Sequence, residues 1–199
     1  MQNKYNIIKN DDEKFNFVLL DKSDIPQIKN LFYLIWNKGG EFPDRFYNVT
    51  LEQNLSYAYK IKDEIIAVCL VGERKSKIYI NAFCVKKEYR RKGIGEALFN
   101  YCIEKCKNFG FNCFYLHVAQ SNIAAINLYK KFGFKTEKEL LDYYIHDVPP
   151  DRDAYLMSLD TSDNTNTTEF INYNNNVKIK KKIKKKKVVA TFFNLYYIL

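Results

Sequence analysis

Apolar residues first alternate along the chain and later repeat with helical spacing, which predicts β-hairpins followed by a strand–helix core. Residues 15–20 alternate and then run apolar, which is typical of a strand. Capping residues precede Ile25 and Pro26, so a helix is predicted to begin there and to end at Gly39 and Gly40. The other predicted elements are strands over 56–60, 64–72, 78–85, 111–118 and 153–159, a strand from 134, a short helix or loop over 42–51, and helices from 94 and 122.

This order of elements predicts an α/β domain with a mixed sheet. The length of 199 residues suits one domain and a tail, and the 47% hydrophobic and 16% aromatic content excludes a wholly disordered chain. After Asp160 the composition changes abruptly to Thr, Ser, Asn and Asp. We therefore expect an N-terminal arm over 1–14, the domain over 15–160, an Asn- and Thr-rich linker over 161–176, and a Lys-rich and apolar tail over 177–199.

The positive charge of the chain is concentrated after the domain. Residues 1–160 hold 24 Lys and Arg against 21 Asp and Glu, whereas residues 161–199 hold 8 against 2. The net charge of +9 therefore belongs mainly to the tail and says little about the substrate of the domain. The N-terminus is polar and no stretch is long enough to cross a bilayer as a helix, so we expect a soluble cytoplasmic protein.

The five cysteines form no regular framework, which fits a reducing compartment. Cys102 and Cys106 lie four residues apart on one predicted helix face, so metal binding is conceivable there. The chain has only two histidines and no second cysteine pair with ligand spacing. Buried thiols are therefore the favoured interpretation, and no metal site is predicted.

Residues 90–95 carry the pattern Arg-x-x-Gly-x-Gly between a predicted strand and a predicted helix. Gly93 and Gly95 let the backbone turn and approach a ligand closely, and the first N–H groups of the helix face an anion. Three neighbouring cations, Arg90, Arg91 and Lys92, favour a diphosphate. The pattern matches neither a Walker loop nor a three-glycine dinucleotide loop. A plain surface turn is the structural alternative.

A second block follows the loop at some distance. It contains Leu116-His117-Val118, then Asn122, and then Leu128-Tyr129-Lys130-Lys131-Phe132-Gly133-Phe134. The loop and this block together resemble the GCN5-related N-acetyltransferases (GNAT), over about residues 15–160. The resemblance implies the GNAT fold and acetyl-CoA as cosubstrate. It also implies a cofactor site made of Phe83, Cys84, Val85, Arg90, Arg91, Lys92, Gly93, Ile94, Gly95, Glu96, Asn122 and Tyr129.

Further residues are similar to the protein N-terminal (Nα) acetyltransferases within that family. They are His117 in its Leu-His-Val context, the pair Tyr143-Tyr144, and the ending Asp153-Ala154-Tyr155-Leu156-Met157. Phe42-Pro43 followed by Phe46-Tyr47 resembles the NatE catalytic subunit and its NatF relative, although Asp44 and Arg45 stand where a tyrosine is usual. The resemblance implies protein N-termini, especially those that begin with Met, as substrates and ribosome-associated acetyltransferase subunits as partners. The implied substrate-binding residues are Phe42, Pro43, Asn81, Tyr143 and Tyr144.

The implied chemistry is direct attack of an amine on a thioester, for which the enzyme must remove one proton. His117 is the natural base, because the pKa of histidine lies near working pH; a satisfied core histidine is the alternative. Tyr79 is expected to position a water or to share its proton with His117, or to be an ordinary strand aromatic. By resemblance Tyr129 lies near the cofactor sulfur; otherwise it is a core residue. Acetylation of lysine side chains or a small amine, and a cofactor-binding domain without activity, remain as other hypotheses.

The tail combines eight lysines over 178–187 with an apolar segment over 188–199. A run of like charge is usually a solvated segment. A polybasic run followed by apolar residues also fits contact with a membrane surface, although 12 residues are too few to span it. Nuclear import or contact with RNA is a third possibility for such a run.

Overall fold

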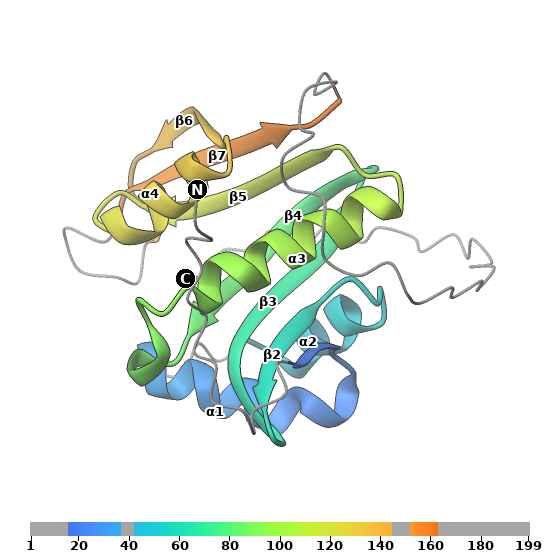
Figure 1. The fold of residues 1–199 in the computed structure, drawn as a ribbon. Coiled ribbons are helices and arrows are strands. Elements are labelled where there is room, and N and C mark those ends of the chain that lie inside the picture. Colours follow the sequence, from blue (N-terminus) through green and yellow to red (C-terminus); the bar gives the residue numbers. More distant parts are fainter. Residues whose placement is uncertain (1–15, 37–41, 145–151, 163–199) are drawn as a thin grey trace, which may run out of the picture.

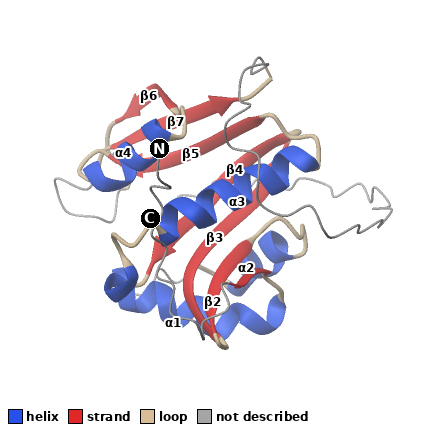
Figure 2. Cartoon of the chain, viewed as in Figure 1, coloured by secondary structure: helices blue, strands red, loops and turns tan. Residues whose placement is uncertain are grey.

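The computed structural model describes residues 16–36, 42–144 and 152–162, and within them a seven-stranded sheet carries helices on both faces (Figures 1 and 2). The strands are β1 (Asn16–Leu19), β2 (Tyr57–Ile61), β3 (Glu64–Arg74), β4 (Lys77–Val85), β5 (Cys113–Ala119), β6 (Lys135–Leu140) and β7 (Ala154–Asp160). The α-helices are α1 (Ile25–Trp36), α2 (Asp44–Leu51), α3 (Ile94–Asn108) and α4 (Ile123–Lys131), and two short 3-10 turns are η1 (Lys22–Asp24) and η2 (Lys87–Tyr89).

The strand order across the sheet is β1-β2-β3-β4-β5-β7-β6. All neighbouring strands are antiparallel except β4 and β5, which run parallel and are connected through α3. Hairpins therefore come first and a strand–helix–strand unit follows, as the hydrophobic pattern predicted. The mixed α/β fold class is confirmed.

Two separate apolar layers hold the helices against the sheet. On one face, Leu98 and Phe99 of α3 and Tyr129 of α4 pack against Ile78 of β4 and Phe114 of β5. On the other face, residues of α1 and α2 pack against alternate positions of β3 and β4, and the largest fully buried ones include Phe32 and Tyr47. Figure 1 shows α3 and α4 on one side of the sheet and α1 and α2 on the other. Successive side chains of the central strands therefore point alternately into the two layers.

Local chemistry explains where several elements begin. The Asp21 side chain accepts from Ser23 N at 2.7 Å, and Asp24 Oδ2 accepts from Asp21 N at 3.1 Å, which completes a capping box at the start of η1. Asp24 is buried, and Lys60 Nζ pairs with it at 2.7 Å. Pro43 precedes the first turn of α2. The segment 42–51, predicted as a short helix or a loop, is therefore a helix from Asp44.

The two central strands separate soon after they meet. Along the described lengths of β4 and β5, ladder pairing is limited to Ile78 with Phe114 and Tyr79 with Tyr115. Beyond those pairs β4 keeps its partner β3 while β5 keeps its partner β7. A β-bulge in β4 lies next to this point, because Ile80 pairs with Val71 and Ala82 with Leu70, which leaves Asn81 as the extra residue. The divergence of β4 and β5 is visible in Figure 1.

The cysteines and the end of the domain can be compared with the predictions made from the sequence. All five cysteines are free thiols and four are buried, with Cys102 and Cys106 on the core face of α3, as predicted. Within the described ranges no three His, Cys, Asp or Glu side chains group as metal ligands, and no helix is long and apolar enough to cross a bilayer. Thr161 N donates to Asn112 O at 2.9 Å, so the packed chain continues one residue past the expected boundary at 160. The arm over 1–14 and the tail over 177–199 lie outside the described residues.

Candidate active site

The glycine loop joins β4 to α3 through a left-handed turn. Arg91 has φ 62° and Gly93 has φ 81°, a conformation that glycine adopts without strain. Gly93 is the N-cap of α3 and contributes no side-chain hydrogen bond to the first turn. The backbone N–H groups at this helix start therefore point outward with the positive end of the helix dipole, as expected for an anion site.

Gly95 serves a different purpose from Gly93. A Cβ atom at Gly95 would lie 3.2 Å from Val85 Cγ2 and 3.3 Å from Phe83 Cζ, whereas one at Gly93 would meet nothing within 4 Å. Gly95 therefore lets the first turn of α3 approach β4 closely. The structure gives Gly95 a packing role against the two β4 side chains, and the predicted contact of both glycines with the ligand stays a prediction.

The cations of the loop are exposed, and two of them have neighbours within the protein. Arg90 Nε donates to Val85 O at 2.9 Å, and Lys92 Nζ lies 5.2 Å from the centre of the Tyr89 ring. Glu96 in the first turn pairs with Lys131 at the end of α4 at 2.6 Å, which ties the two helices together. These contacts hold positive charge beside the start of α3 without burying it.

These features fit acetyl-CoA. The first turn of α3 offers donors to a diphosphate, and the cations lie beside it. Among the described strands, the backbone of Phe83, Cys84 and Val85 pairs with β3 on one side only, so its other edge can pair with an amide-bearing ligand in the manner of an added strand. Both features lie where β4 and β5 separate.

Three aromatic side chains meet on the opposite face of the sheet from α3. His117 Nδ1 lies 3.2 Å from the Tyr79 hydroxyl and 3.1 Å from the Tyr143 hydroxyl. The Tyr143 ring also stacks on the His117 ring, with centroids 4.3 Å apart. The structure therefore brings together a predicted base, its predicted partner Tyr79 and a predicted substrate residue, and we call these three residues the acceptor cluster.

The acceptor cluster is neutral at physiological pH. Burial, helped by the positive charge of Arg74, lowers the pKa of His117 to about 4. Burial raises the pKa of Tyr79, and it raises the pKa of Tyr143 to about 12. Both hydroxyls therefore keep their protons, so His117 Nδ1 acts as the acceptor and the imidazole proton belongs on Nε2.

Arg74 and Asn81 complete this site, and sequence reasoning missed Arg74. The Arg74 guanidinium carbon lies 4.6 Å from the centre of the Tyr79 ring, and Arg74 Nη2 donates to Asn81 Oδ1 at 3.0 Å. Asn81, predicted to bind substrate, is the buried residue of the β4 bulge. No motif marks Arg74; only the pairing register of the β3–β4 hairpin could have brought it to Tyr79.

Tyr129 lies on the α3 side of the sheet, apart from the acceptor cluster. Its ring is buried against Phe99 and Phe134, with centroids 5.3 Å and 5.9 Å away. Burial raises the pKa of Tyr129, with a smaller contribution from the thiols of Cys69 and Cys84. The hydroxyl therefore stays protonated and can only donate to a leaving thiolate. Its predicted role near the cofactor sulfur stays a prediction.

The other predicted residues have mainly structural contacts. Asn122 Oδ1 accepts from Ala125 N at 3.1 Å, so Asn122 is the N-cap of α4. Phe42 is buried in the α1/α2 layer, where it stacks on Phe46 at 4.4 Å, and Pro43 is the N-cap of α2. Tyr144 is buried and meets Tyr143 edge to face at 4.9 Å. Their predicted contacts with cofactor or substrate stay predictions.

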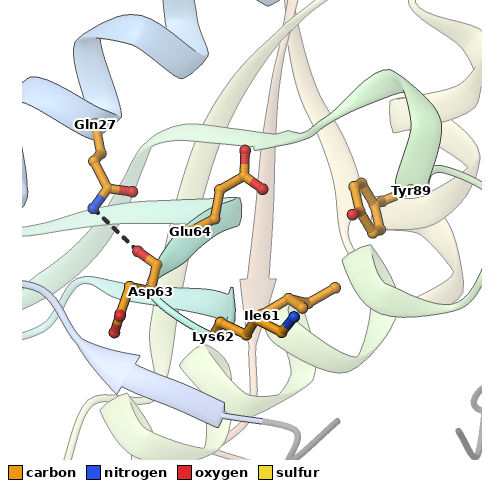
Figure 3. Close-up of a pocket in the computed structure, with 6 residues that line it drawn as sticks. All are labelled: Gln27, Ile61, Lys62, Asp63, Glu64 and Tyr89. Atoms are coloured by element: carbon orange, nitrogen blue, oxygen red, sulfur yellow. Dashed lines mark hydrogen bonds between the residues drawn. The ribbon is translucent and has the colours of Figure 1, made fainter.

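A surface hollow of about 550 Å³ lies elsewhere, between the β2–β3 turn and Tyr89 (Figure 3). Gln27, Lys62, Asp63 and Glu64 line it, and Gln27 Nε2 donates to Asp63 O at 3.2 Å. The hollow is open to solvent, and none of the three residues of the acceptor cluster lines it. The hollow is therefore separate from the acceptor cluster.

Comparison with known proteins agrees with this geometry. The profile of the acetyltransferase (GNAT) family matches residues 25–134, and the chain belongs to this family. N-alpha-acetyltransferase 50 of Danio rerio is 32% identical over 142 residues, which is 68% of this chain and 83% of that protein. Probable N-acetyltransferase san of Drosophila melanogaster is 31% identical over 134 residues, which is 64% of this chain and 72% of that protein.

A solved structure carries the same fold. Arabidopsis thaliana Naa50 in complex with the bisubstrate analogue CoA-Ac-MVNAL matches with a TM-score of 0.64 and 27% identity. The match covers 72% of this chain and 97% of that one. The GNAT fold, expected from the two sequence blocks, and the N-terminal acetyltransferase branch, expected from the further residues around His117, Tyr143 and Tyr155, are confirmed.

Proposed function

We propose that this protein transfers the acetyl group of acetyl-CoA to the α-amino group of protein N-termini, particularly those that begin with Met. One observation carries the proposal. The acceptor cluster lies where β4 and β5 separate, on the opposite face of the sheet from α3, the helix that follows the glycine loop. The relatives named N-alpha-acetyltransferase support the same activity, as does the Arabidopsis relative with its Met-Val-Asn-Ala-Leu analogue.

The residues of the loop and of β4 hold the cosubstrate. The first-turn N–H groups of α3 and the exposed cations face the diphosphate, and the free edge of β4 pairs with the amide groups of the pantetheine. When bound, acetyl-CoA supplies an acetyl thioester at the separation of β4 and β5. The amine nitrogen forms the new C–N bond as the C–S bond breaks, and the sulfur leaves as a thiolate that takes up one proton.

The acceptor cluster takes the proton that the amine loses. An α-amine has a pKa of roughly 8, so about a tenth of it is neutral at pH 7. Permanent transfer of its proton to His117, with a pKa about 4 units lower, would cost roughly 5 kcal/mol. His117 therefore acts as a hydrogen-bond acceptor and relay. The Tyr79 oxygen accepts the amine proton while its own proton moves toward His117 Nδ1, and solvent takes the excess.

A panel of acceptors tests the proposal. Short peptides that vary in their first two residues are compared with free lysine and a polyamine, each with acetyl-CoA and the full chain. Peptides beginning with Met should be acetylated fastest, and the α-acetylated product should be identified by mass spectrometry. Faster acetylation of lysine or polyamine than of every peptide would contradict the proposal.

We also propose that the protein is cytoplasmic, that ribosome-associated acetyltransferase subunits are its partners, and that its tail makes contacts of its own. The tail is proposed to reach a membrane surface through its eight lysines and the apolar segment after them. Anionic vesicles should retain the full chain and release a chain that ends at Ser162. Equal partition of both chains would exclude the tail as an anchor.

A further inference from the structure

Arg74 stands at the edge of the acceptor cluster in a fixed position. In the β3–β4 ladder Gly72 pairs with Tyr79 and Arg74 with Lys77, so Arg74 and Tyr79 project from the same face. The guanidinium stacks on the Tyr79 ring at 4.6 Å and donates one hydrogen bond to Asn81 Oδ1. A flexible side chain is thereby held in one orientation before any ligand arrives.

The residue that orients Arg74 is itself fixed. Asn81 is the bulged residue of β4 and is only 7% exposed. A Cβ atom at Gly72 would lie 2.8 Å from Asn81 Nδ2, so this arrangement requires a glycine at position 72. The bulge, the glycine and the amide together aim the Asn81 oxygen at the guanidinium. Arg74 is exposed to solvent, and this polar support holds its guanidinium in one orientation at the surface, as a binding site requires.

The charge of Arg74 has no carboxylate partner among the described residues. Its neighbour Glu73 pairs with Ile78 and so projects from the opposite face of the sheet. Asp142, next to Tyr143, is already paired with Arg152 at 3.0 Å. Lys77, a second cation on this face of the β3–β4 hairpin, donates to the Tyr115 hydroxyl at 3.2 Å. A stacked guanidinium thus keeps donors in a fork that matches a carboxylate.

Arg74 lies within reach of the start of an acceptor peptide. The Tyr79 hydroxyl points to His117, where the amine reacts, and the face of the same ring carries the guanidinium. An extended chain advances only about 3.3–3.6 Å per residue. The side chains of the first two residues are therefore the ones that can meet Arg74.

We propose that Arg74 determines specificity by binding a carboxylate side chain in the first two residues of the acceptor, so that of two otherwise identical N-termini the one with an acidic residue there is preferred. This inference rests on the proposed function. It adds a preference for acidic side chains, which a preference for Met at the first position does not predict. The bidentate fork distinguishes Glu from its neutral isostere Gln, because only the carboxylate accepts both hydrogen bonds with a compensating charge.

The test compares initial rates of the full chain on matched peptides that begin Met-Glu, Met-Gln, Glu-Leu and Gln-Leu. At least one Glu peptide should exceed its Gln counterpart in kcat/KM by about five- to tenfold at low ionic strength. The ratio should fall as salt is added, because the site is accessible to solvent. Arg74→Gln should bring the ratio close to one, and Arg74→Glu should favour a Met-Lys peptide over Met-Glu.

Lys77→Gln is the matched control, because it removes a cation from the same hairpin and the same face while Tyr79 keeps its stacked arginine. It should retain the preference for Glu. Equal rates on Glu and Gln peptides, or a preference that survives Arg74→Gln, would overturn the assignment while leaving N-terminal acetylation intact. Failure to acetylate any peptide would overturn the proposed function together with this inference.

Discussion

On the face covered by α3 and α4, the proposed cosubstrate site consists mainly of backbone from one continuous stretch, residues 83–96. On the face covered by α1 and α2, the proposed acceptor site consists of side chains from β3, β4, β5 and the segment around Tyr143. The first therefore depends mainly on backbone conformation and on the space that Gly95 leaves beside β4. In the second, each group depends on neighbours from other strands.

The largest effect is expected from a substitution that affects the acceptor site alone. His117→Ala removes the acceptor that both tyrosine hydroxyls share, so kcat should fall about 10²- to 10⁴-fold. The dissociation constant of CoA, measured by calorimetry, should stay unchanged because the glycine loop is untouched. Tyr115→Phe is the control, since Tyr115 lies on the same face two residues earlier and should keep wild-type turnover. Near-wild-type turnover of His117→Ala would remove His117 from the mechanism.

The acceptor side should also make stability depend on pH. Burial lowers the pKa of His117 from 6.5 to about 4, so between these values the unfolded chain binds a proton that the folded protein refuses. The free energy of unfolding should therefore fall as the pH drops through that window, by about 3 kcal/mol in total. Urea unfolding at pH 4, 5, 6 and 7 should show a shallower dependence in His117→Gln than in the wild type. Equal slopes would contradict a neutral, buried His117.

Substitutions at Gly93 and Gly95 separate the effect of backbone conformation from the effect of packing in the proposed cosubstrate site. Gly95→Val forces methyl groups against Phe83 and Val85, so it should cost about 1–3 kcal/mol and weaken CoA binding. Gly93→Ala meets no neighbour within 4 Å but must adopt φ 81°, which costs about 1–2 kcal/mol. Gly93→Asn should cost less than Gly93→Ala, because Asn tolerates this conformation. Thermal and urea unfolding measure the stability of all three variants. Equal stability of Gly93→Ala and Gly93→Asn would contradict the role of Gly93 in the backbone conformation of the loop.

The smallest expected effect concerns the start of α4. Asn122→Ala removes the cap on Ala125 N and should lower the free energy of unfolding by about 1 kcal/mol. Asn122→Asp keeps an accepting oxygen and should be close to the wild type. If Asn122 also contacts the cosubstrate, the KM for acetyl-CoA of the Asp variant will rise while its stability does not change. An unchanged KM would leave Asn122 with a capping role alone.

Much of the fold followed from local patterns, because strand alternation and helix periodicity depend on neighbouring residues. The helix from Ile94, the helix that follows Asn122 and the strand before the loop all lie where they were predicted, within a few residues. The glycine loop was predictable for the same reason, since its conformation depends on residues 90–95 themselves. The helix over 44–51 was ambiguous, because Pro43 and a short polar run fit both a helix start and a loop.

The acceptor site was predictable only in part. His117, Tyr79 and Tyr143 were named from a resemblance, but their meeting depends on β4 and β5 pairing in one register and then separating. Phe42 was named from a resemblance as a substrate residue, and the structure shows only that its ring is packed into the α1/α2 layer. Arg74 carries no local signal at all. Its position depends on hairpin length, on the bulge at Asn81 and on the space above Gly72.

The sequence by itself determined the order of elements, the conformation of the glycine loop and the family, since each is encoded over a few adjacent residues. The tertiary structure alone decided that His117 is neutral, that Tyr129 lies on the other face from it, and that Arg74 stacks on Tyr79. The physical reason is the range of the interactions. Backbone conformation is set by near neighbours, whereas burial, charge and hydrogen bonds between strands are set by residues far apart in the chain.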